Sequence, residues 1–93
     1  MTEKSHDTIF IGKKPLMSYV TSAIIQLSSL PSITLKARGL SIGRAVDISQ
    51  IILQKTSIFE IGSVKIGSES LESSDGRKRD VSTIEIPVTR IGQ

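Results

Sequence analysis

The chain of 93 residues contains no cysteine, no tryptophan and a single histidine. Without cysteine it can form no disulfide, no thiolate zinc site and no iron–sulfur cluster, and it has no thiol nucleophile. His6 lies in a polar segment, where a solvated side chain is a better interpretation than a catalytic proton carrier. No apolar run reaches the roughly 18 residues that a membrane-spanning helix needs. We therefore expect neither thiol or histidine chemistry nor a membrane partner.

Aromatic residues and enzyme motifs are also scarce. Phe10, Tyr19 and Phe59 are the only aromatic residues, and three scattered rings do not form the platform on which a protein stacks several bases. The sequence has no Walker A loop, no G-x-G-x-x-G turn and no G-x-S-x-G elbow. We predict that the protein is not an enzyme and uses no cofactor or metal ion.

The length and mass, 93 residues and 10.1 kDa, correspond to one domain. We expect residues 1–7 to be a flexible polar tail and residues 8–93 to fold. The tail does not resemble a signal peptide, which favours a cytoplasmic protein. Twelve Lys and Arg against nine Asp and Glu give a formal net charge of +3. This excess permits an anionic partner such as nucleic acid but does not establish one.

The first half of the chain predicts two strand–helix units. Residues 8–11 are short, branched and apolar, as in a buried strand, and Pro15 suits the first turn of a helix that ends before Pro31. Residues 33–38 alternate between apolar and polar side chains, which predicts a second strand. Ser41 is a suitable N-cap for a second helix. Two consecutive units of this kind imply parallel strands joined by a right-handed crossover.

The second half predicts two more strands, at residues 58–66 and 81–90. The apolar phase changes at Gly62, which indicates a β-bulge, and Asp75-Gly76 is typical of a hairpin turn. Pro87 cannot donate to a sheet ladder, so we expect a free strand edge beside it. The order β-α-β-α-β-β predicts an α+β fold, a two-layer α/β sandwich with both helices on one face of the sheet.

The second helix has more apolar surface than packing on one sheet requires. Its main face carries several apolar residues, and Ile48 and Ile51 widen the apolar arc. We predict that the excess is buried against a second copy of the chain, with Ile48, Ile51 and Ile52 in the dimer interface.

Seven of the twelve cationic residues fall in three connecting regions of the predicted fold. They are Lys13, Lys14, Arg38, Arg44, Arg77, Lys78 and Arg79. The ends of parallel strands meet at one edge of a sheet, so Lys13, Lys14 and Arg38 should be neighbours. The lysines also precede a helix N-terminus, which favours phosphate. For each residue, ordinary solvated surface remains an alternative, and Arg44 could instead pair with Asp47.

Three segments together resemble the Alba family of archaeal chromatin proteins. Residues 11–20 (IGKKPLMSYV) are similar to the opening signature of that family, and residues 36–47 (KARGLSIGRAVD) to its second signature. Residues 74–77 and 81–86 resemble its hairpin and last strand. The likeness extends from about residue 9 to residue 90.

The resemblance implies a fold like the C-terminal domain of bacterial translation initiation factor three. It also implies a homodimer that binds double-stranded DNA and RNA with little sequence preference and organises or compacts chromosomal DNA. Lys13, Lys14 and Arg38 would meet phosphates, and a basic hairpin arm at about residues 67–80 would follow the minor groove. Lys13 matches the acetylation site of the family, which implies an acetylase and deacetylase pair.

The sequence departs from this pattern at several positions and leaves other roles open. Leu40 stands where many relatives carry a basic residue, and the phenylalanine that some relatives use between dimers has no clear match near Thr56 or Ile58. One alternative is an RNA-centred role, as a chaperone or a subunit of an RNA-processing particle. Another is a protein-interaction module whose cations only keep it in solution.

Overall fold

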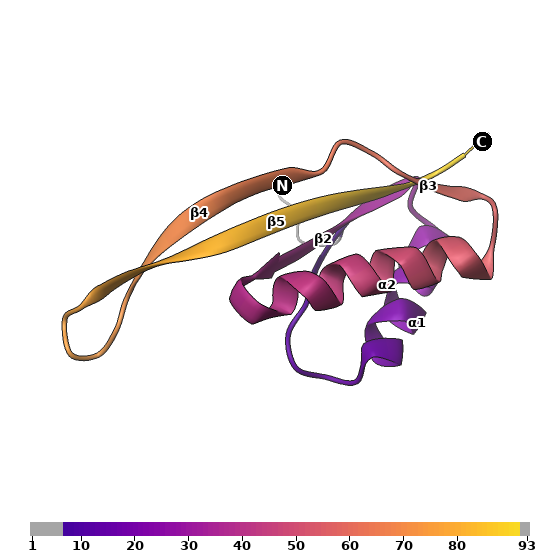
Figure 1. Cartoon of the computed structure of the whole chain (residues 1–93). Coiled ribbons are helices and arrows are strands. Elements are labelled where there is room, and N and C mark those ends of the chain that lie inside the picture. The colour runs from indigo at the N-terminus through magenta and orange to yellow at the C-terminus, as the bar shows by residue number, and fades with distance from the viewer. Residues whose placement is uncertain (1–6, 92–93) are drawn as a thin grey trace.

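The computed structural model describes residues 7–91, and most of the predicted tail, residues 1–7, therefore lies outside the described residues. The elements follow the predicted order, and the strand predicted at residues 58–66 is divided in two (Figure 1). They are β1 (Thr8–Phe10), α1 (Leu16–Leu27), β2 (Ser32–Arg38), a 3-10 turn (Gly39–Ser41), α2 (Ile42–Lys55), β3 (Phe59–Ile61), β4 (Lys65–Glu72) and β5 (Lys78–Arg90).

Both helices lie against the same face of the sheet, as the alternating strands predict (Figure 1). In β2, Ile33, Leu35 and Ala37 are buried and the intervening side chains are not. On α1 the buried positions are Tyr19, Val20, Ala23 and Leu27, which form one helical stripe. The predicted α+β two-layer sandwich is thereby confirmed, and within residues 7–91 the opposite face of the sheet carries no helix.

The helix boundaries follow local chemistry. Pro15 directly precedes α1, where its missing N–H costs no hydrogen bond, and α1 ends at Leu27, before Pro31. Ser41 precedes α2 as predicted, but its side chain makes no capping hydrogen bond. The reason is that the chain enters α2 through a 3-10 turn, so Ser41 already has helical backbone angles.

Strand β5 is the centre of the sheet. The order is β1-β2-β5-β3, and β4 also pairs with β5. β1 and β2 are parallel, as predicted, and every pairing of β5 is antiparallel. β5 is 13 residues long and accepts β3 and β4 in succession along one side.

The predicted bulge at Gly62 is present, whereas the free edge predicted beside Pro87 is not. Ile61 pairs with Val88 but Lys65 pairs with Glu85, so three residues (62–64) face two (86–87) between β3 and β4. The Gly62 amide donates to the Pro87 carbonyl at 2.9 Å. Pro87 therefore sits in the middle of the sheet, and its missing donor is accommodated where the opposing strand is interrupted.

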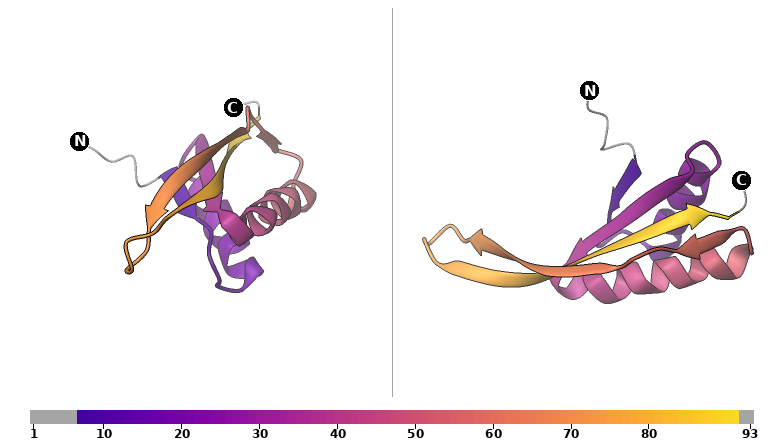
Figure 2. Two further views of the ribbon diagram at one scale, coloured as in Figure 1. Left: turned by 60° about the vertical axis from the view of Figure 1, so that its left-hand side comes forward. Right: turned by 90° about the horizontal axis from the view of Figure 1, so that it is seen from above.

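The hairpin of β4 and β5 extends beyond the two-layer body as an arm (Figure 2). Its tip is a turn in which Gly76 has a φ of 86°, a conformation that glycine adopts without strain. The Ser73 amide donates to the Arg77 carbonyl at 2.8 Å and closes the turn. The arm predicted at about residues 67–80 is thus a continuation of the main sheet.

Two of the three residues predicted for the dimer interface, Ile48 and Ile52, belong to the hydrophobic core instead. Ile48 and Ile52 are 0% exposed in the single chain, because they lie on the side of α2 that faces the sheet. A partner chain cannot contact them without unfolding the domain. Only Ile51, which is partly exposed, remains available among the three predicted residues.

Candidate nucleic-acid interface

Lys13 and Lys14 lie on the loop between β1 and α1, and both are exposed. The loop is held from below by Tyr19, which is buried on α1. Its hydroxyl oxygen accepts the Gly12 amide at 2.9 Å and the Lys14 amide at 3.2 Å. The two lysines thus extend from a backbone that is fixed on both sides of Lys13. Fixed cations lose less conformational entropy when they bind phosphate.

Arg44 fixes the same loop from the first turn of α2. Its Nε donates to the Gly12 carbonyl at 2.9 Å, and its Nη2 donates to the Lys14 carbonyl. The sequence placed Arg44 among the nucleic-acid-binding residues, and in the structure its Nε and Nη2 are engaged by the loop. Arg44 forms no ion pair with Asp47 among the described residues either. The structure assigns it to holding the lysines, with its charge added to theirs.

The structure brings Arg38 to the same edge of the sheet as the lysine loop. The Ile11 amide donates to the Lys36 carbonyl at 2.8 Å, so the chain leaves β1 beside the C-terminal end of β2. Arg38 forms an ion pair with Glu69 of β4, at 3.0 Å from Nη1 to Oε1. Both side chains are more than one-third exposed, and exposed pairs contribute about 1 kcal/mol or less. Arg38 can therefore exchange Glu69 for phosphate at low cost.

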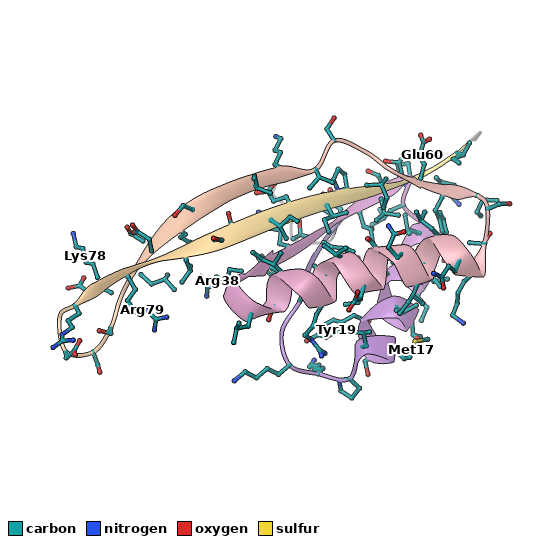
Figure 3. All side chains as sticks on the ribbon, viewed as in Figure 1. Met17, Tyr19, Arg38, Glu60, Lys78 and Arg79 are labelled. Atoms are coloured by element: carbon teal, nitrogen blue, oxygen red, sulfur yellow. The ribbon has the colours of Figure 1, made fainter. Side chains whose placement is uncertain are left out.

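The arm carries the other three predicted cations, but they do not act as one patch. Lys78 and Arg79 are successive strand residues and point to opposite sides of the ribbon (Figure 3). Arg79 shares the open face of the sheet with Arg38, whereas Lys78 faces the other way. Arg77 lies 3.7 Å from Asp75, measured from Nε to Oδ2.

Acidic residues reduce the field of the arm. Asp80 accepts a hydrogen bond from Ser70 at 2.7 Å. The Ser73 hydroxyl, and next the Arg77 amide, donate to Asp75 and lower the pKa of that carboxyl from 3.8. Asp75 is therefore ionised at neutral pH, and its carboxylate organises the turn by accepting these two hydrogen bonds.

This arrangement has the chemistry of an anion-binding surface. Within residues 7–91, no three His, Asp or Glu side chains are grouped so that they could hold a metal ion. In the same residues, no helix is both long and apolar enough to cross a membrane.

The comparison with protein families decides the relationship. The sequence model of the Alba family matches residues 7–68, which include the lysine loop, Arg38 and Arg44. The chain belongs to the Alba family. A curated relative from Nitrosopumilus maritimus, named DNA/RNA-binding protein Alba, is 66% identical over 92 residues. The aligned region covers 97% of this chain and 97% of the relative.

Two solved structures share the fold. Alba from Thermoplasma volcanium superposes with a TM-score of 0.83 at 35% identity, over 89% of this chain and 99% of that one. ALBA1 from Trypanosoma brucei has a TM-score of 0.73 at 16% identity, over 96% of this chain and 73% of that one. The second likeness concerns the Alba fold alone.

Sequence reasoning missed Tyr19 and Glu69. Tyr19 lies in the apolar stripe of α1, and a hydroxyl in such a stripe usually has a backbone partner when it is buried. This tendency predicts a backbone partner for the Tyr19 hydroxyl but does not identify the loop that supplies it. Nothing in the sequence paired Glu69 with Arg38, since their proximity depends on the register of β4 on β5 and of β5 on β2.

Proposed function

We propose that this Alba protein binds double-stranded DNA and RNA through their phosphates, without catalysis and with little sequence preference. The observation that carries the proposal is the lysine loop, whose backbone is fixed by Tyr19 and Arg44 beside Arg38. Lys13, Lys14 and Arg38 anchor the backbone of the duplex, and Arg77, Lys78 and Arg79 extend the contact along a groove. No side chain in these regions has the bidentate amide geometry that reads base edges.

The biological role that fits this chemistry is the organisation and compaction of chromosomal DNA in the cytoplasm. The name of the Nitrosopumilus relative includes both DNA and RNA, and a phosphate surface does not discriminate strongly between the two duplexes. Lys13 is the residue at which acetylation by an acetylase, reversed by a deacetylase, would remove charge from the loop and weaken binding.

Self-association completes the proposal. One stripe of α2 carries Ile42, Val46 and Leu53, of which Val46 is exposed and the other two are partly exposed. This stripe replaces the predicted set that included Ile48 and Ile52. A homodimer built on it would cover apolar area that the small domain leaves open, and would double the number of phosphate contacts.

The test is a salt-titrated binding assay with duplex DNA and structured RNA side by side. Lys13→Glu should weaken binding to both by about tenfold at low salt and flatten the log–log salt dependence by about 0.9 per lost contact. Lys55→Glu is the matched control, because it changes net charge equally at the opposite end of α2. It should change affinity by less than about twofold if local phosphate contacts dominate over long-range charge.

The outcomes separate the alternatives. Equal losses for Lys13→Glu and Lys55→Glu would reduce the loop to general surface charge. Binding to structured RNA alone would favour the RNA-centred role. Absence of binding to either nucleic acid would favour a protein-interaction module and overturn the proposal.

A further inference from the structure

The face of the sheet that carries no helix contains a shallow groove of about 610 Å³. It crosses the strands at the base of the arm, and its walls come from β1, β2, β4 and β5. Its lining combines one aromatic ring, two cations, two carboxylates and small hydroxyl residues. The lining includes Phe10, Lys36, Arg38, Glu69, Thr83 and Glu85.

Phe10 is the one aromatic residue of the described chain that is available to a ligand. Its side chain is 70% exposed, whereas Tyr19 and Phe59 are buried. Lys36, its neighbour across the β1–β2 ladder, holds its Nζ 5.9 Å from the centre of the Phe10 ring. The ring therefore stands at the groove with a cation beside it and an open apolar surface.

Next to the groove, a small residue of β4 faces Thr83, which is one of the lining residues. Gly67 pairs with Thr83, and a Cβ placed on Gly67 would lie 3.3 Å from the Thr83 hydroxyl. A side chain at residue 67 would thus crowd the Thr83 hydroxyl. Its absence leaves this hydroxyl, which lines the groove, open to a ligand.

The charges around the groove are held in exposed pairs. Lys36 lies 3.7 Å from Glu85, and Arg38 lies 3.0 Å from Glu69. Exposed pairs of this kind contribute little to stability, so a ligand can separate them at low cost. The freed cations suit a phosphate, and the carboxylates can accept the exocyclic amino hydrogens of a base.

We infer that this groove binds one unpaired nucleotide of a single-stranded nucleic acid, with the base stacked on Phe10 and its phosphates at Lys36 and Arg38. The inference rests on the proposed function, because Arg38 is common to the groove and the phosphate surface. By the alternation of β5, Arg79 belongs to the same face of the sheet further along the arm, which gives the strand a cationic path beyond the groove. A single ring holds a single base, so the exclusion of a many-base platform still applies.

A duplex does not satisfy this site. Its bases are stacked on one another and present only their edges in the grooves, so no base face is free for Phe10. An unpaired base has both faces free, and stacking on an aromatic side chain is tolerant of base identity. The groove thus distinguishes single strands from duplexes, which the lysine loop does not.

The experiment compares a labelled single-stranded RNA with a duplex RNA of the same length by fluorescence anisotropy. Phe10→Ala should weaken single-strand binding at least about fivefold and change duplex binding by less than about twofold. Ile25→Ala removes a similarly exposed apolar side chain from α1, and we expect it to change neither. Circular dichroism of each variant checks that the fold is retained.

Phe10→Trp gives a second, direct readout, because the chain contains no other tryptophan. It should retain single-strand affinity, and its fluorescence should be quenched by the single strand but not by the duplex. Unchanged single-strand affinity of Phe10→Ala, or an unquenched tryptophan at saturation, would overturn the inference. If Lys13→Glu leaves duplex binding intact while Phe10→Ala weakens the single strand, the proposed duplex function fails and the base site stands.

Discussion

At the scale of single residues, the Tyr19 hydroxyl is the contact whose removal isolates loop position from charge. Tyr19→Phe leaves the net charge unchanged but removes the acceptor for the Gly12 and Lys14 amides. We expect nucleic-acid affinity to fall about threefold to tenfold and unfolding free energy to fall by about 1 kcal/mol. Hydrogen exchange at these two amides should accelerate by NMR. Lost stability with unchanged affinity would show that the loop position does not matter for binding.

Arg44 shows why sequence reasoning at this scale has a limit. The sequence identified its charge and its position at the start of a helix, and both were right. It could not show that the guanidinium turns toward two carbonyl groups of a loop about 30 residues earlier. Such a contact depends on how α1 and α2 are packed, which apolar spacing does not specify.

At the scale of elements, the turn at the tip of the arm has a pH dependence with a definite sign. The pKa of Asp75 is lowered from 3.8, first by the Ser73 hydroxyl and then by the Arg77 amide. The folded turn therefore favours the ionised carboxyl. Its contribution is present above pH 3.8 and is lost as the pH falls through the lower, folded pKa.

The measurement is a carboxyl ¹³C titration of the arm. The pKa of Asp75 should lie below 3.8 in the native protein, and Ser73→Ala should raise it toward that value because the hydroxyl donor is gone. The Ser70→Ala variant is the control, since its hydroxyl bonds Asp80 instead. An Asp75 pKa that Ser73→Ala leaves unmoved would contradict this account of the turn.

The strands also show what alternation can and cannot predict. The buried residues of β2 follow the sequence pattern, because helices cover that face along its length. Ile66 has the same apolar character but is 82% exposed. It lies beside Ile84 on the helix-facing side of the sheet, at an edge where no helix of the chain reaches it. A pattern identifies the apolar face of a strand, and only the packed layers decide how much of that face is covered.

At the scale of the whole molecule, the exposed side of α2 predicts a dimer. Sedimentation at micromolar concentration should give twice the monomer mass of 10.1 kDa. Val46→Glu should shift the protein to the monomer, because it places a charge in the proposed apolar contact. Ile25→Glu places the same charge on an exposed apolar position of α1, and the dimer should persist. A wild-type monomer would exclude this interface.

The dimer stays a prediction, and two of the three residues first assigned to its surface do not fit it. The second helix does carry a wide apolar arc, but Ile48 and Ile52 are buried in the core of the single chain. The order of elements, the parallel first pair and the bulge were all predictable from local patterns. The position of β5 between β2 and β3 was not, since it depends on pairings between distant parts of the chain.

That position of β5 also governs when the molecule can fold. β5 is the last strand in the chain but the central strand of the sheet, and β2, β3 and β4 all pair with it. While the protein is being synthesised, β1 and β2 form only a two-stranded fragment, and β3 and β4 have no strand to join. Such contacts close long loops and are slow to form. The ribosome must therefore deliver β5 before a native sheet exists, and the apolar faces of both helices stay exposed until then.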